Sequence, residues 1–219
     1  MFQIIDAVLT PAELEQVRGR LATMTFVDGA SSAGWNARLV KNNTQAQPSP
    51  DHAHISRLVL EAITRHPDFH LGVRPQRIRP LQFSRYVDGM AYGDHLDSAT
   101  MDQMRVDVSF TLFLCDPATY DGGELVVQDR AGDRVFKLKP GQALAYPSTT
   151  LHRVEPVTRG ERLAAVGWCQ SLVRDPAHRE ILYDLEIARR TLFDKDGKTR
   201  EFDLLSKALV NLVRMWTEI

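Results

Sequence analysis

Hydrophobic residues near the N-terminus recur every three or four positions, which is the spacing of one face of an α-helix. The first stripe follows Thr10-Pro11-Ala12-Glu13, where Thr10 suits the N-cap and Glu13 the third helical position of a capping box. A second stripe predicts a helix over about 51–65, and the polar segment 28–50 between the two helices is typical of loop. The stripes consist of Leu14, Val17, Leu21 and Met24, and then of Ile55, Leu58, Val59, Ala62 and Ile63.

From residue 76 the pattern changes to the period of two that is typical of strands. Apolar residues alternate with others between 106 and 114, which predicts a strand with two distinct faces. Glycine-containing turns separate further short apolar runs at 125–127, 135–136, 143–146 and 163–168. Many short strands at this spacing favour a sandwich or barrel over a parallel sheet with crossover helices.

After about Ser171 the strand pattern stops and helical spacing returns over 178–192 and 201–216, with a turn at 194–197 between them. The sequence therefore predicts a mostly β domain with N-terminal helices over 1–171 and a helical C-terminal extension over 172–219. The extension has nine basic and nine acidic residues from Arg174 onward, so it is no basic tail. A helix pair this small needs a surface to pack on, which is either the β core or a second subunit, and a homodimer is one expectation.

Composition and charge exclude several classes of protein. The 219 residues include 27 Lys and Arg and 28 Asp and Glu, a formal net charge of −1, and 43% are hydrophobic. This balance argues against nucleic-acid binding, polybasic membrane attachment and disorder. The N-terminus lacks the features of a signal peptide and no long apolar stretch predicts a membrane span, so we expect a cytoplasmic protein.

Two of the seven histidines lie in a pattern that suits a metal site. His95 and Asp97 are two positions apart in an extended-looking region, where residues i and i+2 point to the same side. His152 precedes another strand-like run. Two histidines and one carboxylate can occupy one face of an octahedron, as in non-haem Fe(II) oxygenases. Of the other five histidines, those at 52, 54, 66 and 178 are expected in or near helices and His70 in a loop, which suggests surface or core roles.

Arg162 follows His152 by ten residues and lies on the run that continues to Trp168. A guanidinium offers a rigid fork that matches a carboxylate, which an oxygenase with a 2-oxo acid co-substrate needs close to its metal. By themselves, a His-x-Asp pair, a distant histidine and an arginine are also compatible with a surface strand and a chance cluster.

The whole pattern resembles the Fe(II)/2-oxoglutarate-dependent dioxygenases of the prolyl/lysyl hydroxylase type, in particular the bacterial PKHD-type hydroxylases. The resemblance covers about residues 78–171 by motif. It is carried by RYVDGMAYGDHLDSA (85–99), RVDVSFTLFLCDP (105–117), YDGGELVV (120–127) and LKPGQALAYPSTTLHRVEPVTRGERLAAVGW (138–168). It implies a double-stranded β-helix, or jelly-roll, core with the metal in its open mouth.

The resemblance also implies roles for single residues. His95, Asp97 and His152 would be the iron ligands, and Arg162 would bind the C5 carboxylate of 2-oxoglutarate. Tyr86 and Tyr92 fall where related enzymes place pocket tyrosines, although a packing role is the other interpretation. Gly122 and Gly123 suit a tight turn.

The implied reaction is hydroxylation of a substrate with release of succinate and CO2, and L-ascorbate is implied as an auxiliary reductant. The substrate would be a small molecule or a peptide, and relatives linked to iron or siderophore uptake suggest an iron-chelating target. Two alternatives stay open from the residues: a non-catalytic metal-binding or sensing protein on the same fold, and a different metalloenzyme such as a cupin-like isomerase or zinc hydrolase.

Overall fold

The alternating run near residue 110 forms the centre of the larger of the two main antiparallel sheets in the computed structural model, which describes residues 2–218. This eight-stranded sheet has the order β1-β14-β10-β17-β6-β4-β2, and β5 also pairs with β17. Its strands are β1 (Gln3–Ile5), β14 (Ala143–Pro147), β10 (Val108–Phe113), β17 (Arg162–Ser171), β6 (Gln82–Tyr86), β4 (Thr44–Ala46), β2 (Phe26–Asp28) and β5 (Pro75–Ile78).

The second sheet has five strands in the order β13-β12-β15-β7-β3. They are β13 (Gly132–Phe136), β12 (Leu125–Asp129), β15 (His152–Val154), β7 (Ala91–His95) and β3 (Lys41–Asn42). Two short antiparallel pairs complete the strands: β8 (Thr100–Met101) with β9 (Met104–Arg105), and β11 (Asp121–Gly122) with β16 (Val157–Arg159). Side chains from both sheets line one cavity, so the sheets enclose a common interior, as the predicted jelly roll requires.

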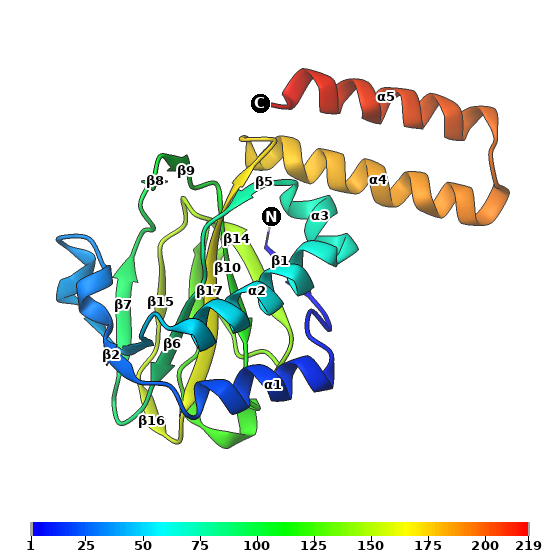
Figure 1. Ribbon diagram of the computed structural model, residues 1–219. Coiled ribbons are helices and arrows are strands. Elements are labelled where there is room, and N and C mark those ends of the chain that lie inside the picture. Colours follow the sequence, from blue (N-terminus) through cyan, green and yellow to red (C-terminus); the bar gives the residue numbers. More distant parts are fainter. Residues whose placement is uncertain (1, 219) are drawn as a thin grey trace.

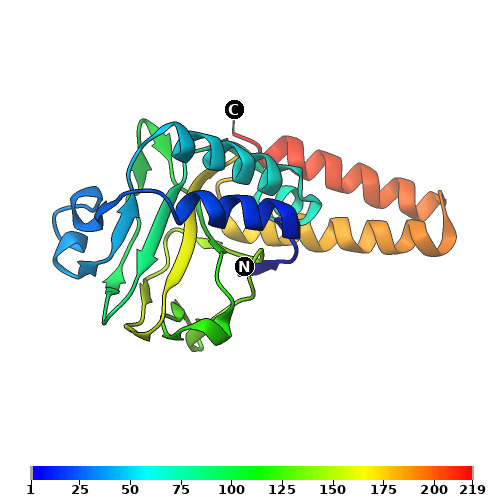
Figure 2. The ribbon, with the colours of Figure 1, turned by 60° about the horizontal axis from the view of Figure 1, so that its bottom comes forward.

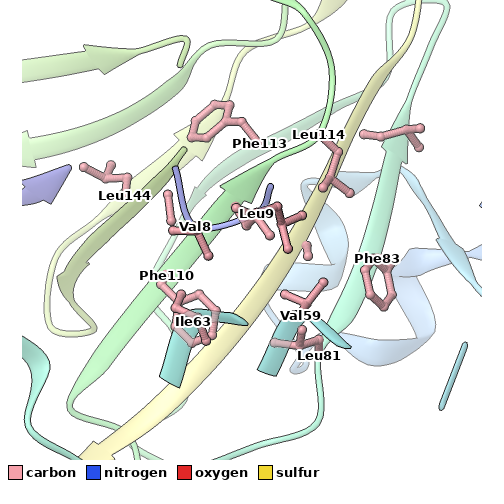
Figure 3. Close-up of a cluster of buried hydrophobic side chains, with 14 of the residues drawn as sticks. Val8, Leu9, Val59, Ile63, Leu81, Phe83, Phe110, Phe113, Leu114 and Leu144 are labelled. Carbon is pink, nitrogen blue, oxygen red and sulfur yellow. The ribbon is translucent and has the colours of Figure 1, made fainter. Parts of the chain in front are cut away.

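Three N-terminal helices cover the outer face of the larger sheet (Figures 1 and 2). They are α1 (Pro11–Leu21), α2 (Pro50–Arg65) and α3 (Pro67–Val73), and single turns of 3-10 helix occur at Gly29–Ser32, Ala37–Leu39 and Pro117–Thr119. Figure 3 shows Val59 and Ile63 of α2 near Leu81, which immediately precedes β6, and near Phe83 and Phe110 of the sheet. These side chains are at most 2% exposed, so burial of the helices' apolar stripes holds them on the sheet.

The predicted capping box of α1 is confirmed. The backbone N–H of Glu13 donates to Oγ1 of Thr10 at 3.3 Å, and the backbone N–H of Thr10 donates to Oε2 of Glu13 at 2.8 Å. Pro11 occupies the first helical position, where its missing N–H leaves no intrahelical bond unmade. The helix therefore begins where the sequence indicates.

The alternate residues of strand β10 point to opposite sides of the larger sheet. All six of its residues are buried, so neither face meets solvent. Phe110 lies on the helix side, where its ring meets that of Phe69 in α3 edge to face at 5.5 Å. Ser109 and Thr111 face the other way, toward the residues of the candidate site. The two predicted faces are thus an apolar face for the helices and a more polar face for the cavity.

The expectation that segment 28–50 is mostly loop is wrong in part, because β3 and β4 lie within it. Each has only two or three residues, too few to show a period, and Lys41 and Gln45 are polar although only 9% exposed. His70, expected in a loop, lies in α3, and residues 194–196, expected in a turn, are the end of α4. Short length and polar lining hide β3 and β4 from pattern analysis. Helix α4 simply continues to Asp196 and is capped at Gly197.

The C-terminal helices α4 (Pro176–Asp196) and α5 (Arg200–Trp216) form an antiparallel hairpin that projects beyond the sheets (Figure 1). A small cluster of its own, Val173, Leu182 and Leu209, lies where the hairpin begins. The division into 1–171 and 172–219 stays a prediction. No helix among residues 2–218 is long and apolar enough to cross a bilayer.

Candidate metal centre

Strand pairing explains how His95 and His152 meet although they are far apart in the sequence. In the antiparallel pair of β7 and β15, His152 lies directly opposite His95. Directly opposed residues of adjacent strands have their side chains on the same face of the sheet. The two ring centroids are 4.2 Å apart, and the residues are only 8% and 5% exposed.

Both imidazoles are oriented by backbone carbonyls. Nδ1 of His95 lies 2.9 Å from the carbonyl oxygen of Gly93, and Nδ1 of His152 lies 3.0 Å from that of Thr150. A carbonyl can only accept, so each Nδ1 carries the proton and each Nε2 is left with a free lone pair. Burial, followed by the proximity of His152, lowers the pKa of His95 to about 4, so this ring is neutral and able to bind a metal at neutral pH.

Asp97 lies two residues beyond the end of β7 and is held from the larger sheet. Oγ of Ser109 on β10 donates to Oδ2 of Asp97 at 2.5 Å, and Oγ of Ser148 lies 2.8 Å from Oγ of Ser109. The same Oδ2 is 3.7 Å from Nε2 of His152. A pair of buried serines therefore fixes the carboxylate beside the two imidazoles.

The structure brings together the three residues singled out in the sequence. One donor atom from each of His95, Asp97 and His152 lies within 4.8 Å of the other two, a spacing at which one metal ion can bind all three. Of the other histidines, His52 packs against Phe83 in the core and His178 stacks on Trp216, outside this cluster.

Arg162, at the start of β17, is 2% exposed and lines the same cavity. Its guanidinium carbon lies 5.1 Å from the ring centroid of Tyr86 and 5.5 Å from that of Phe113, yet its Nε and Nη2 have no hydrogen-bond partner. A Cβ on Gly123, where φ is +67°, would lie 3.0 Å from Cδ of Arg162, so glycine is needed for this close packing. Buried N–H groups without partners favour an anionic ligand here.

The two tyrosines named in the sequence both line the cavity. The ring of Tyr92 stacks on His95 with centroids 3.5 Å apart, and burial raises the pKa of its hydroxyl well above the ordinary value. Tyr86 is directly opposite Arg162 in the β6–β17 pair. Tyr92 thus packs against a candidate metal ligand, and Tyr86 packs against Arg162. Because both tyrosines also line the cavity, their positions fit a packing role and a contact with a bound molecule equally.

Sequence reasoning missed Ser109, Ser148 and Lys41. Each is at most 9% exposed, and Lys41 on β3 lines the cavity. Burial lowers the pKa of Lys41 to about 8, with Asp97 and Asp28 opposing the shift, so it still carries a charge at neutral pH. The alternation of apolar and polar residues in β10 could have identified Ser109 as facing away from the apolar side. The segment around Lys41 has no such alternation.

Comparisons with known proteins agree with this geometry. A sequence model of the 2OG-Fe(II) oxygenase superfamily matches residues 81–170. The chain is 54% identical to a PKHD-type hydroxylase of Acaryochloris marina and 51% identical to one of Picosynechococcus, with 100% of both chains covered in each case.

Solved structures show the same fold at much lower identity. A prolyl hydroxylase from Trichoplax adhaerens has a TM-score of 0.60 at 16% identity, covering 82% of this chain and 86% of that chain. A 2OG-Fe(II) oxygenase-family oxidoreductase from Burkholderia pseudomallei has a TM-score of 0.57 at 22% identity, covering 76% and 82%. The predicted jelly-roll core is therefore confirmed. Because identity near one half extends along the entire chain, the protein belongs to the PKHD-type hydroxylases of the 2OG-Fe(II) oxygenase superfamily and is an oxygenase enzyme.

Proposed function

We propose that His95, Asp97 and His152 hold the Fe(II) ion that the family implies. The observation that carries this proposal is that one ligand atom each from two imidazoles and one carboxylate lie within 4.8 Å of one another. Both Nδ1 atoms are engaged by backbone carbonyls, which leaves the Nε2 atoms for the metal. This ligand set suits Fe(II) and leaves further coordination positions for co-substrate and oxygen. Ser109 and Ser148 orient the carboxylate, and the backbone carbonyls fix the tautomers of the two histidines.

Arg162 is the proposed partner for the C5 carboxylate of 2-oxoglutarate. Its Nε and Nη2 have no partner in the protein, and its Cδ packs so closely on Gly123 that a Cβ there would lie only 3.0 Å away. A carboxylate accepting from these N–H groups gives charge-assisted hydrogen bonds in a site shielded from water. The residues present therefore fit the co-substrate that the family implies.

The proposed reaction is hydroxylation of an unreactive C–H bond in a substrate. When bound, the iron with 2-oxoglutarate and O2 supplies the oxidising chemistry, with succinate and CO2 as co-products. The protein's own residues bind and orient the co-substrate and exclude bulk water, since the metal ligands and Arg162 are all at least half buried.

The proposed function is tested by measuring succinate in anaerobically prepared protein with Fe(II) and 2-oxoglutarate after admission of O2. Peptides and siderophores are added in turn as candidate substrates. We expect succinate formation that requires both Fe(II) and O2 and rises with an accepted substrate. Iron binding with no succinate under any condition would instead favour the non-catalytic alternative.

Ser109 provides a milder test of the metal site. We expect Ser109→Ala to lower the affinity for Fe(II) or Mn(II) by roughly ten- to a hundredfold, because it removes the hydrogen bond that orients Asp97. Ser56→Ala is the matched control: this serine is also buried, but it lies on α2. Metal titration monitored by calorimetry measures both, and equal affinities in the two variants would contradict the role of Ser109.

The substrate, the auxiliary reductant, the location and the oligomeric state are proposed from the family resemblance and the exposed surface. We propose a small-molecule or peptide substrate connected with iron or siderophore uptake, L-ascorbate as the auxiliary reductant, and a cytoplasmic location. A homodimer through the C-terminal helices is also proposed, since the hairpin exposes Leu204, Val210 and Met215. Nucleic acid and membranes are not among the expected partners, in keeping with the net charge of −1.

A further inference from the structure

The cavity is longer than the proposed co-substrate requires. Arg162 and Trp168 both line it, and they lie six positions apart on the same strand, β17. A strand rises about 3.3 Å per residue, so these two positions are roughly 20 Å apart. A five-carbon dicarboxylate anchored at Arg162 therefore leaves the part of the cavity beyond the metal ligands for a second molecule.

Lys41 enters this cavity from β3, beside the candidate metal ligands. Lys41 is opposite Tyr92 in the β3–β7 pair, and His95 follows three positions later on β7. Its Nζ donates to Oγ of Ser32 at 2.9 Å and lies 5.0 Å from the ring centroid of Tyr92. An ammonium group has three N–H donors, so most of its hydrogen-bonding capacity is available to a ligand.

Charge compensation singles out this lysine among the cations of the cavity. Arg79 is paired with Asp102 at 2.7 Å, and Arg162 has the proposed C5 carboxylate of 2-oxoglutarate. Asp97 and the other carboxylate of 2-oxoglutarate would balance the charge of Fe(II). Lys41 forms no ion pair among residues 2–218. The two carboxylates that act on its charge are Asp97, which the metal would occupy, and Asp28, which is exposed to solvent. Once metal and co-substrate are bound, the charge of Lys41 is therefore the least compensated of the three cations. A buried cation without a counter-charge is costly unless a ligand supplies one.

A second residue of the cavity wall contains an unpaired donor. Nε1 of Trp168, a residue only 6% exposed, has no hydrogen-bond partner. The indole N–H can only donate. Beyond the co-substrate end, the ammonium of Lys41 offers N–H donors at the cavity wall, which favours a ligand with acceptor oxygens.

We propose that Lys41 binds a carboxylate of the primary substrate and so selects anionic substrates for hydroxylation. The inference rests on the proposed function, since it assigns the co-substrate to Arg162 and leaves Lys41 for the second molecule. It names a substrate class, a carboxylate on a partly apolar body, because Tyr92, Leu96 and Met101 line the cavity as well.

The test compares benzoate with benzamide, two flat molecules that differ in charge. Protein is first loaded with Mn(II) in place of Fe(II), then with 2-oxoglutarate, and each probe is titrated by calorimetry. The variants are Lys41→Met and, as matched control, Lys137→Met. Lys137 also lies over a tyrosine, with Nζ 4.4 Å from the Tyr120 ring, but it is paired with Glu124 and is not a cavity residue.

We expect benzoate to bind roughly tenfold or more tightly than benzamide to the wild type and to Lys137→Met, because a charge-assisted hydrogen bond is stronger than a neutral one. Lys41→Met should bind the two probes equally and keep its affinity for 2-oxoglutarate. The proposal is overturned if the wild type shows no preference for benzoate, if Lys41→Met retains it, or if Lys41→Met loses 2-oxoglutarate instead. Failure of the proposed function would show earlier, as no binding of 2-oxoglutarate to the Mn(II)-loaded wild type.

Discussion

Replacing Asp97 by alanine is expected to remove bound iron and hydroxylase activity together. Asp97 is the one carboxylate in the His95–Asp97–His152 cluster, so its loss removes the only anionic protein ligand for a divalent cation. Two neutral imidazoles alone bind Fe(II) much more weakly. We expect the iron content after dialysis and the rate of succinate formation to fall by at least roughly a hundredfold. Replacing residues that only hydrogen-bond to metal ligands already lowers metal affinity or activity by about ten- to a hundredfold, and loss of a ligand itself should cost no less.

The control for this variant is Asp94→Ala. Asp94 lies on the same strand as His95, but it is exposed and has a single long contact, 3.5 Å to Arg153. Metal content measured by mass spectrometry and thermal unfolding of the metal-free proteins separate ligand loss from misfolding. If the Asp97 variant bound iron with wild-type affinity, the three-residue centre would be wrong.

The period of two correctly predicted a strand with two distinct faces, and one of these faces contributes to the site. In β10 the apolar phase packs under the helices, while the phase containing Ser109 and Thr111 faces the cavity. In β17 the phase of Arg162, Val166 and Trp168 lines the cavity. Because β10 and β17 are neighbours in one sheet, the alternate residues that point away from the helices must face the same interior in both strands. The N-terminal helix start was equally local and therefore predictable.

The parts that could not be predicted depend on contacts between distant segments. Ser148 meets Ser109 across 39 positions, and no local pattern encodes that hydrogen bond. Lys41 lies on a two-residue strand whose place is set by its pairing with Tyr92 on β7. Because such a strand is shorter than the period that would reveal it, and because its inward side chain is polar, the segment had the composition of a loop.

Arg162→Met is expected to weaken 2-oxoglutarate binding by roughly a hundredfold while iron binding stays intact. Charge-assisted hydrogen bonds from a buried guanidinium contribute about 1.5–3 kcal/mol each, and about 3 kcal/mol in total corresponds to a factor of this size. Methionine fills much of the volume between Tyr86 and Phe113 without offering a donor. Titration of 2-oxoglutarate into Mn(II)-loaded protein measures the loss directly.

Thermal unfolding of the same variant separates a ligand-binding arginine from a structural one. Because Nε and Nη2 of Arg162 have no partner in the protein, removing this buried cation should leave the melting temperature of the metal-free protein unchanged or higher. Arg85→Met is the control: Arg85 is next to Tyr86 on β6 but lies over the Phe26 ring at 4.2 Å and should leave 2-oxoglutarate affinity unchanged. A lower melting temperature for Arg162→Met with unchanged co-substrate affinity would assign Arg162 to the fold and not to the site. If Arg162 serves to bind the co-substrate, the variant must show the opposite pair of results: weaker binding of 2-oxoglutarate without a lower melting temperature.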